Sequence, residues 1–316
     1  MITASQPRLR ERFSGLDNCT YLISHSMGAA PLAARDALVG FWDDWSHDGP
    51  EAWERWLPAI DEIADGIGVI IGAPRGSVGL APNVSALQET LASALDFDDK
   101  RNVVVYEALQ FPSLAYVWDA WRRRGAQPRC VPTDDGRTIP TERIVAAIDE
   151  RTRVVVLSHA YFQSGSVVDV APIVKRAHEL GALVVLDIYQ TAGVIPVDVR
   201  ALGVDVAVGG SHKWLCGGPG CGYMYMRPEL RAQFEPTATG WMAHAAPFAF
   251  EPPPTRYADG MKRFGNGTPS VQAYLQARAG HQLISEVGPQ AIRAHNLALT
   301  ELILAEADAR TIETPT

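Results

Sequence analysis

Short apolar runs alternate with amphipathic stretches along the chain from about residue 68 onward. The clearest strand predictions, from their β-branched content, are NVVVYE (102–107), RVVVLSH (153–159), LVVLD (183–187), DVAVGG (205–210) and GYMYM (222–226). Runs that are apolar at successive positions suit strands buried on both faces, as in a parallel sheet. Helical spacing is found between these runs, at residues 113–125, 141–150 and 169–181. The alternation predicts an α/β fold, with a mostly parallel central sheet and helices on both faces.

The proline-rich run at residues 251–255 marks a change in organisation, since it continues neither a helix nor a central strand. Two amphipathic stretches follow it, at residues 271–286 and 290–307. We therefore expect three parts: an N-terminal segment at 1–45 that contributes to a small domain and to the active site, a large domain at 46–250, and the start of a C-terminal small domain at 251–316.

Composition narrows the functional classes. The formal charge of -8 comes from acidic and basic residues mixed along the chain, which disfavours nucleic acid as a partner. No apolar run approaches the roughly 20 residues of a membrane helix, and the first residues lack the apolar core of a signal peptide. We therefore predict a cytoplasmic protein without a membrane partner. The cysteines show no paired framework, so we expect reduced thiols and no metal site at Cys19, Cys130, Cys216 and Cys221.

Two polar side chains lie where ligands collect in such folds, at the carboxyl ends of predicted strands. Asp187 directly follows four apolar residues, and Lys213 follows the run DVAVGGSH. Taken alone, the two could form a salt bridge. A lysine that forms a Schiff base needs a lowered pKa, and a carboxylate beside a pyridine nitrogen keeps that nitrogen protonated. The pair therefore also suits a pyridoxal phosphate (PLP) site, in which Gln190 would donate a hydrogen bond to the phenolic oxygen.

A phosphate-binding helix start is predicted in VGLAPNVSALQETLAS. There a short apolar strand and a Pro-Asn turn lead into a helix that begins near Val84 and Ser85. Main-chain N–H groups at such a start bind anions. Asn83 and Ser85 are also ordinary N-cap residues, and the segment alone does not decide between the two roles.

Several sequence blocks resemble one family and occur in that family's order over most of residues 21 to 275: YLISHSMG, ALQFPS, VVLDIYQTAGVIPVDV, GGSHKWLCGGPGCGYMY, TGWMAH and RFGNGTPSV. They look like those of kynureninase and its relatives in the class V aminotransferase superfamily. The combination of D-x-x-Q with S-H-K-W is highly specific. The resemblance implies a PLP-dependent enzyme with the fold-type I transferase architecture.

The resemblance also implies a role for each matching position. Lys213 would form the internal Schiff base, Asp187 would pair with the pyridine nitrogen, and Phe111 would stack on the ring unless it merely fills the core. Thr268 would reach the phosphate in the neighbouring subunit, which implies a homodimer with shared active sites, unless it is only a turn residue. The full set of implied cofactor contacts is Val84, Ser85, Phe111, Asp187, Gln190, Ser211, His212, Lys213 and Thr268, in which Val84, Ser85 and Ser211 hold the phosphate.

The implied substrate contacts are Ser26, Trp241 and His244, because the matching blocks line the substrate pocket of kynureninases. Each of the three also suits a structural role, and His25 stands where the family usually has Asn. The remaining tryptophans of the N-terminal part recur at helical spacing and suit packing or a dimer surface: Trp42, Trp45, Trp53 and Trp56.

Three positions depart from kynureninases. Leu114 stands where they usually have Asp, His212 where a Tyr precedes the lysine, and Gln190 where a His follows the aspartate. The last two look more like cysteine desulfurases. Enzymes of this kind also carry a later segment with an Arg that grips the substrate carboxylate. Because the chain ends at Thr316, before that region, we expect the C-terminal small domain to be incomplete.

The leading functional expectation is an enzyme that binds an amino acid as an external aldimine and cleaves its Cβ–Cγ bond by hydrolysis. Kynureninase does this with kynurenine, and the substrate here would be kynurenine or a related compound of secondary metabolism. An aminotransferase or a carbon–sulfur lyase of the desulfurase type is the alternative. A PLP-binding protein without turnover is a more remote one.

Overall fold

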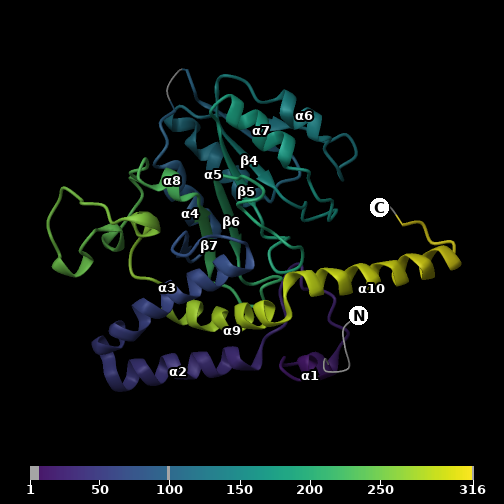
Figure 1. Ribbon diagram of the computed structural model, residues 1–316, viewed down its shortest axis with the longest axis horizontal. Helices are drawn as coiled ribbons and strands as arrows, with labels where there is room; N and C mark the ends of the chain where they lie inside the picture. Colours follow the sequence, from purple (N-terminus) through teal and green to yellow (C-terminus); the bar gives the residue numbers. More distant parts are fainter. Residues whose placement is uncertain (1–6, 98–99, 315–316) are drawn as a thin grey trace.

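Helices cover both faces of a central β-sheet in the computed structural model, which describes residues 7–97 and 100–314 (Figure 1). Residues 1–6 of the predicted N-terminal segment and 315–316 of the predicted C-terminal part lie outside the described residues. Figure 1 also shows the last helix, α10, extending away from the body. The predicted α/β architecture with a mostly parallel sheet is confirmed.

The described residues form a seven-stranded sheet in the order β1-β7-β6-β5-β4-β2-β3. The strands are β1 (Val78–Ala81), β2 (Val103–Glu107), β3 (Gln127–Val131), β4 (Thr152–Ser158), β5 (Leu183–Asp187), β6 (Val206–Gly210) and β7 (Gly222–Met226). The five strands named from their apolar runs are all present. Strand β3 was not predicted, because it is an edge strand with Pro128 and Arg129 among its residues and pairs only with β2.

One strand direction corrects the sequence prediction. Strand β7 runs antiparallel to both of its neighbours, β6 and β1, whereas its apolar run predicts a parallel strand. The chain between β6 and β7 spans residues 211–221 and holds no helix. A parallel return to the same sheet needs a crossover, usually helical, so this short loop instead brings the chain back at the same edge.

The helices predicted between the strands are present and end earlier than the periodicity suggested. The α-helices are α1 (Pro7–Arg10), α2 (Leu32–Asp48), α3 (Trp53–Ile70), α4 (Val84–Ala92), α5 (Pro112–Ala120), α6 (Thr141–Ala146), α7 (Ala171–Glu179), α8 (Pro228–Arg231), α9 (Val271–Val287) and α10 (Pro289–Ala309). The 3-10 helices are η1 (Leu16–Asn18), η2 (Gly49–Ala52), η3 (Trp121–Arg124), η4 (Trp241–Ala243), η5 (Pro247–Ala249) and η6 (Gly260–Phe264).

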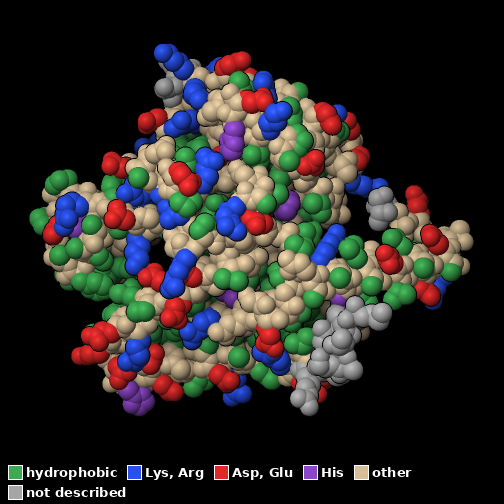
Figure 2. Space-filling model, in the orientation of Figure 1, with side chains coloured by type: hydrophobic (Ala, Val, Ile, Leu, Met, Phe, Trp, Pro, Cys, Tyr) green, Lys and Arg blue, Asp and Glu red, His purple; other side chains and the backbone are tan. Residues whose placement is uncertain are grey.

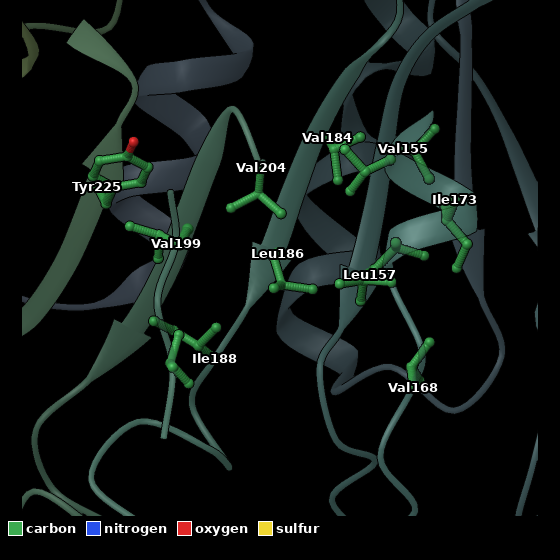
Figure 3. Packing of buried hydrophobic residues seen from close by; sticks show 14 of the residues in the cluster. Val155, Leu157, Val168, Ile173, Val184, Leu186, Ile188, Val199, Val204 and Tyr225 are labelled. Atoms are coloured by element: carbon green, nitrogen blue, oxygen red, sulfur yellow. The ribbon is translucent and has the colours of Figure 1, made fainter. Parts of the chain in front are cut away.

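The central strands are apolar at most positions because each face of the sheet packs against helices. Figure 3 shows one face, where Val155 of β4 lies beside Val184 of β5, Leu157 lies beside Leu186, and Ile173 of α7 lies close to both β4 residues. Successive side chains point to opposite faces of a strand, so the residues between these pack on the other side. There the fully buried Trp118 of α5 donates its indole N–H to Gln88 of α4, at 2.6 Å.

The N-terminal and C-terminal parts of the chain lie side by side, because α9 packs against both α2 and α3. Trp56 is buried at this junction and stacks on Phe41, with ring centroids 5.0 Å apart. Trp42 and Trp45 are 61% and 56% exposed instead. Of these tryptophans, Trp56 thus packs internally, whereas Trp42 and Trp45 lie on the surface. The division of the chain into three domains stays a prediction.

The surface carries charges of both signs, which are scattered over the face seen in Figure 2. This distribution fits the moderate net charge of -8. Among the described residues, none of the helices combines the length and the apolar content that crossing a bilayer requires.

Candidate active site

Strands β5 and β6 bring Asp187 and Lys213 to the same edge of the sheet. The strands are parallel neighbours, with Asp187 opposite Val208, and Lys213 lies in the loop that follows Gly210. Asp187 is buried, and burial raises its pKa to about 6, although the Tyr189 amide and the charge of Lys213 both oppose the rise. Burial also lowers the pKa of Lys213, against the attraction of Asp187. A lysine with a lowered pKa releases its proton more readily and can act as a nucleophile or base.

Two aromatic rings flank the amine of Lys213. Its Nζ lies 5.4 Å from the ring centroid of Phe111 and 4.7 Å from that of Tyr189. Phe111 is 42% exposed and meets Phe162 edge to face, with centroids 5.3 Å apart. An aromatic residue with this much exposed surface beside a lysine is better placed to contact a ligand than to fill the core.

The start of α4 lies at the same edge. Gly222 of β7 pairs with Gly210 of β6, and a Cβ at position 222 would lie 3.1 Å from the main-chain nitrogen of Val84. The side chain of Asn83 caps the helix by accepting a hydrogen bond from Ala86 N–H at 2.9 Å. This cap uses neither the Val84 nor the Ser85 amide, so the N-cap role and the predicted phosphate role are compatible.

The N-terminal segment folds over the lysine loop. Gly28 N–H donates to the carbonyl of His212 at 2.7 Å, and a Cβ on Gly28 would lie only 2.1 Å from the Lys213 carbonyl oxygen. Ser26 therefore belongs to this edge of the molecule, two residues from the close contact. Only glycine permits such an approach of two main chains.

Gln190 lies near the lysine, but its amide is engaged. Its Oε1 accepts from the Trp214 indole N–H at 2.8 Å, and its Nε2 donates to the His25 carbonyl at 3.2 Å. The side chain thus joins the lysine loop to the N-terminal segment. The predicted hydrogen bond from Gln190 to the phenolic oxygen of PLP stays a prediction.

Ser211 connects the lysine loop to α9. Its side chain is fully buried, and its hydroxyl lies 2.8 Å from Nε2 of His281 in α9. Its main-chain N–H donates to the carbonyl of Cys221, the residue before Gly222. Its contact with a phosphate stays a prediction.

Trp241, His244 and Thr268 lie in the segment between α8 and α9. Trp241 packs against Phe248 and Phe250, while His244 accepts from Ala246 N–H at 3.1 Å. Figure 1 shows the first part of this segment projecting from one side of the sheet. The contacts of these three residues with a substrate or a phosphate stay predictions.

Sequence reasoning missed two side chains near Asp187, the partly buried Tyr189 and the buried Glu107. Tyr189 lies in the same turn as Asp187 and Gln190, and Glu107 ends the strand NVVVYE at the same edge. Glu107 is only 1% exposed, and its Oε1 accepts from Ser158 N–H at 2.5 Å. Burial, with some repulsion from Asp187, raises the pKa of Glu107 to about 8. The sequence signal that could have identified Glu107 is a carboxylate at the end of an apolar run.

Glu107 should make the folded state less stable at alkaline pH. Its folded pKa of about 8 lies above its ordinary value of 4.5. Its contribution to the free energy of unfolding is therefore fully present below pH 4.5 and is lost as the pH rises through 8. We expect Glu107→Gln to retain the Ser158 bond and to raise the unfolding free energy at pH 9 by on the order of 2–4 kcal/mol.

Urea unfolding at pH 5 and pH 9 measures this effect. The increase in unfolding free energy of Glu107→Gln over the parent should be present at pH 9 and small or absent at pH 5. The exposed Glu142→Gln in α6 is the matched control and should show no such pH dependence. Equal stabilities of Glu107→Gln and the parent at pH 9 would contradict the buried ionisation.

Comparison with known proteins agrees with this geometry. The family model described as Aminotransferase class-V matches residues 83–312, which is more than half of the chain. The chain belongs to the class V aminotransferase family. An uncharacterised aminotransferase, YcbU of Bacillus subtilis, is 30% identical over 90% of this chain and 75% of its own length. A kynureninase of Pseudomonas fluorescens is 28% identical over 96% of this chain and 74% of its own.

Solved structures share the class V fold. The cysteine desulfurase CsdA of Escherichia coli has a TM-score of 0.82 at 20% identity and covers 97% of this chain and 77% of its own. The cystine C–S lyase C-DES, in complex with cysteine persulfide, has a TM-score of 0.79 at 24% identity, over 87% of this chain and 74% of its own. As a class V family member, the protein is a PLP-dependent enzyme.

The residues at this edge fit PLP. Asp187 accepts from Tyr189 N–H through Oδ1 at 2.8 Å, which leaves Oδ2 to face a protonated pyridine nitrogen. Lys213 supplies an amine within reach of the exposed ring of Phe111, and the first turn of α4 supplies amides for a phosphate. A carboxylate, an amine and a helix start at one sheet edge are the groups that this cofactor requires.

Proposed function

We propose that this class V enzyme attaches PLP to Lys213 and cleaves the Cβ–Cγ bond of an amino acid by hydrolysis, as a kynureninase does. The pairing of a buried Asp187 with a lysine of lowered pKa is the observation that carries the cofactor assignment. The kynureninase relatives, which align with 96% of this chain, support the choice of reaction.

Bound PLP supplies an electron sink for the bonds broken around the substrate's α-carbon. Lys213 is the base for the α-proton, because its amine loses a proton easily and lies between two aromatic rings. Asp187 holds a negative charge in a buried position, where it favours a protonated ring nitrogen. Val84 and Ser85 offer main-chain N–H groups to the phosphate.

A carbon–sulfur lyase is the second candidate, because Gln190 and His212 match that subfamily and the solved structures include a cystine lyase and desulfurases. The cysteines near the lysine do not suit a desulfurase nucleophile. Burial raises the pKa of Cys216 to about 11 and that of Cys221 to about 12, so both stay protonated thiols.

We further propose that the active enzyme is a homodimer in which the segment between α8 and α9 serves the neighbouring site. Within one subunit, Trp241 and His244 pack with residues of their own segment. Thr268 is exposed at the end of the same segment. A second copy would allow these residues to meet a substrate and a phosphate held by the neighbouring subunit.

Incubation of the PLP-loaded protein with kynurenine, 3-hydroxykynurenine, cysteine and alanine tests the reaction. We expect kynurenine or 3-hydroxykynurenine to yield the corresponding anthranilate and alanine, measured by anthranilate fluorescence and amino-acid analysis. Release of sulfide or pyruvate from cysteine, with kynurenine left intact, would replace this proposal with the lyase. No product from any substrate would favour a cofactor-binding protein without turnover. Protein treated to remove PLP serves as the blank.

A further inference from the structure

Tyr189 connects three parts of the proposed site. Its main-chain N–H donates to Oδ1 of Asp187 at 2.8 Å, and its ring centroid lies 4.7 Å from Nζ of Lys213. Its hydroxyl lies 2.8 Å from Nδ1 of His212, the residue before the lysine. One residue therefore contacts the Asp187 carboxylate through its main chain, and the Lys213 amine and the loop that carries it through its side chain.

The sheet makes room for this side chain. A Cβ at Gly210, the last residue of β6, would lie 1.9 Å from the Tyr189 hydroxyl oxygen. Any other residue at this position would therefore displace the ring or the strand. The ring thus occupies the space that the missing side chain of Gly210 leaves at the end of β6.

The hydroxyl of Tyr189 lies where it can donate a hydrogen bond to Nδ1 of His212. Burial raises the pKa of Tyr189, so the phenol keeps its proton. Burial and the charge of Lys213 lower the pKa of His212, so the imidazole is neutral near pH 7. A neutral imidazole has one N–H and one acceptor nitrogen, and a phenol that donates to Nδ1 leaves the hydrogen on Nε2.

We propose that Tyr189 is a positioning residue, whose ring holds the Lys213 amine opposite Phe111 and whose hydroxyl keeps His212 in its Nε2–H tautomer. This inference rests on the proposed attachment of PLP to Lys213. A PLP attached to Nζ would lie near both aromatic rings, because Nζ is 5.4 Å from the Phe111 centroid and 4.7 Å from the Tyr189 centroid. Aromatic faces stabilise a nearby cation and contribute contact area.

Two substitutions separate the two parts of this role. Tyr189→Ala removes the ring, and we expect the PLP dissociation constant to rise about tenfold, measured by equilibrium dialysis. Tyr189→Phe keeps the ring, and we expect parent-like PLP affinity. In that variant His212 should change from a single Nε2–H tautomer to a mixture, measured by nitrogen-15 chemical shifts of histidine-labelled holoenzyme. The His212→Asn variant assigns the resonance.

Tyr225→Phe is the matched control, because Tyr225 is a buried tyrosine of the same sheet, opposite Ala207 and away from the lysine. It should change neither PLP affinity nor the His212 resonance. Parent-like PLP affinity in Tyr189→Ala, or an unchanged His212 tautomer in Tyr189→Phe, would overturn the proposal. If Tyr189→Ala does not fold, the Tyr189→Phe spectrum still decides.

Borohydride reduction followed by peptide mass spectrometry separates this inference from the function on which it rests. A pyridoxyl group found away from Lys213 in the parent protein refutes the attachment, and the Tyr189 role with it. A pyridoxyl group on Lys213, together with variants that behave like the parent, refutes the Tyr189 role alone.

Discussion

Replacing Lys213 with alanine should lower kcat by about 10⁴-fold or more and abolish covalent attachment of PLP. The reason is that one amine serves both as the attachment point and as the base for the α-proton. Its Nζ lies between Phe111 and Tyr189, and among the described residues Lys213 is the lysine that contacts those rings. Product formation from the active substrate and mass spectrometry after borohydride reduction measure the two losses.

Lys175→Ala is the control for this experiment. Lys175 lies on α7, its side chain is 79% exposed, and its partner is Glu179 at 3.9 Å. We expect parent-like turnover and attachment in this variant. Turnover by Lys213→Ala within tenfold of the parent would show that another group serves as the base.

Replacing Asp187 with asparagine should lower kcat by about 10²–10³-fold, because the ring nitrogen loses the negative charge that favours its protonation. Stability should change in the opposite direction. The folded pKa of about 6 lies above the ordinary value of 3.8, so the contribution of this group is present below pH 3.8 and lost as the pH rises through 6. At pH 7.5 the neutral amide should therefore be at least as stable as the carboxylate.

Asp205→Asn gives the matched comparison. Asp205 is 1% exposed, it precedes β6 at the other edge of the sheet, and it pairs with Arg227 at 2.8 Å and His178 at 2.9 Å. Loss of its charge should lower the thermal midpoint without changing kcat per folded molecule. If Asp187→Asn also lost stability and kept its kcat, Asp187 would be a structural residue like Asp205.

For Asp187→Asn we expect a lower kcat but no loss of stability, and this combination is common at active-site residues. A buried charge is held at a cost to folding because the reaction requires it. Glu107, one strand further along the edge beyond Ser158, is a second buried carboxyl group, but its pKa of about 8 leaves it largely protonated at neutral pH. Burial raises the pKa of both carboxyl groups, but the charge of Lys213 opposes the rise at Asp187, whereas the charge of Asp187 adds to the rise at Glu107.

The sequence by itself determined the buried strands of the sheet and the two chemical groups at its edge, but neither the edge strand β3 nor the direction of β7. Strands with runs of apolar residues are recognisable because both faces of a covered sheet exclude water. Asp187 and Lys213 were recognisable for the converse reason, since a polar residue directly after a buried strand lies at the edge where ligands bind. Spacing along the chain is enough for such predictions.

Only the tertiary structure decided which way the other side chains point. Ser211 turns to His281, seventy positions later in the chain, because α9 packs there. Tyr189 reaches His212 because Gly210 leaves a slot for its ring, and β7 reverses because a short loop cannot carry a crossover. These outcomes depend on contacts between segments distant in sequence, and local patterns of polarity carry no information about them.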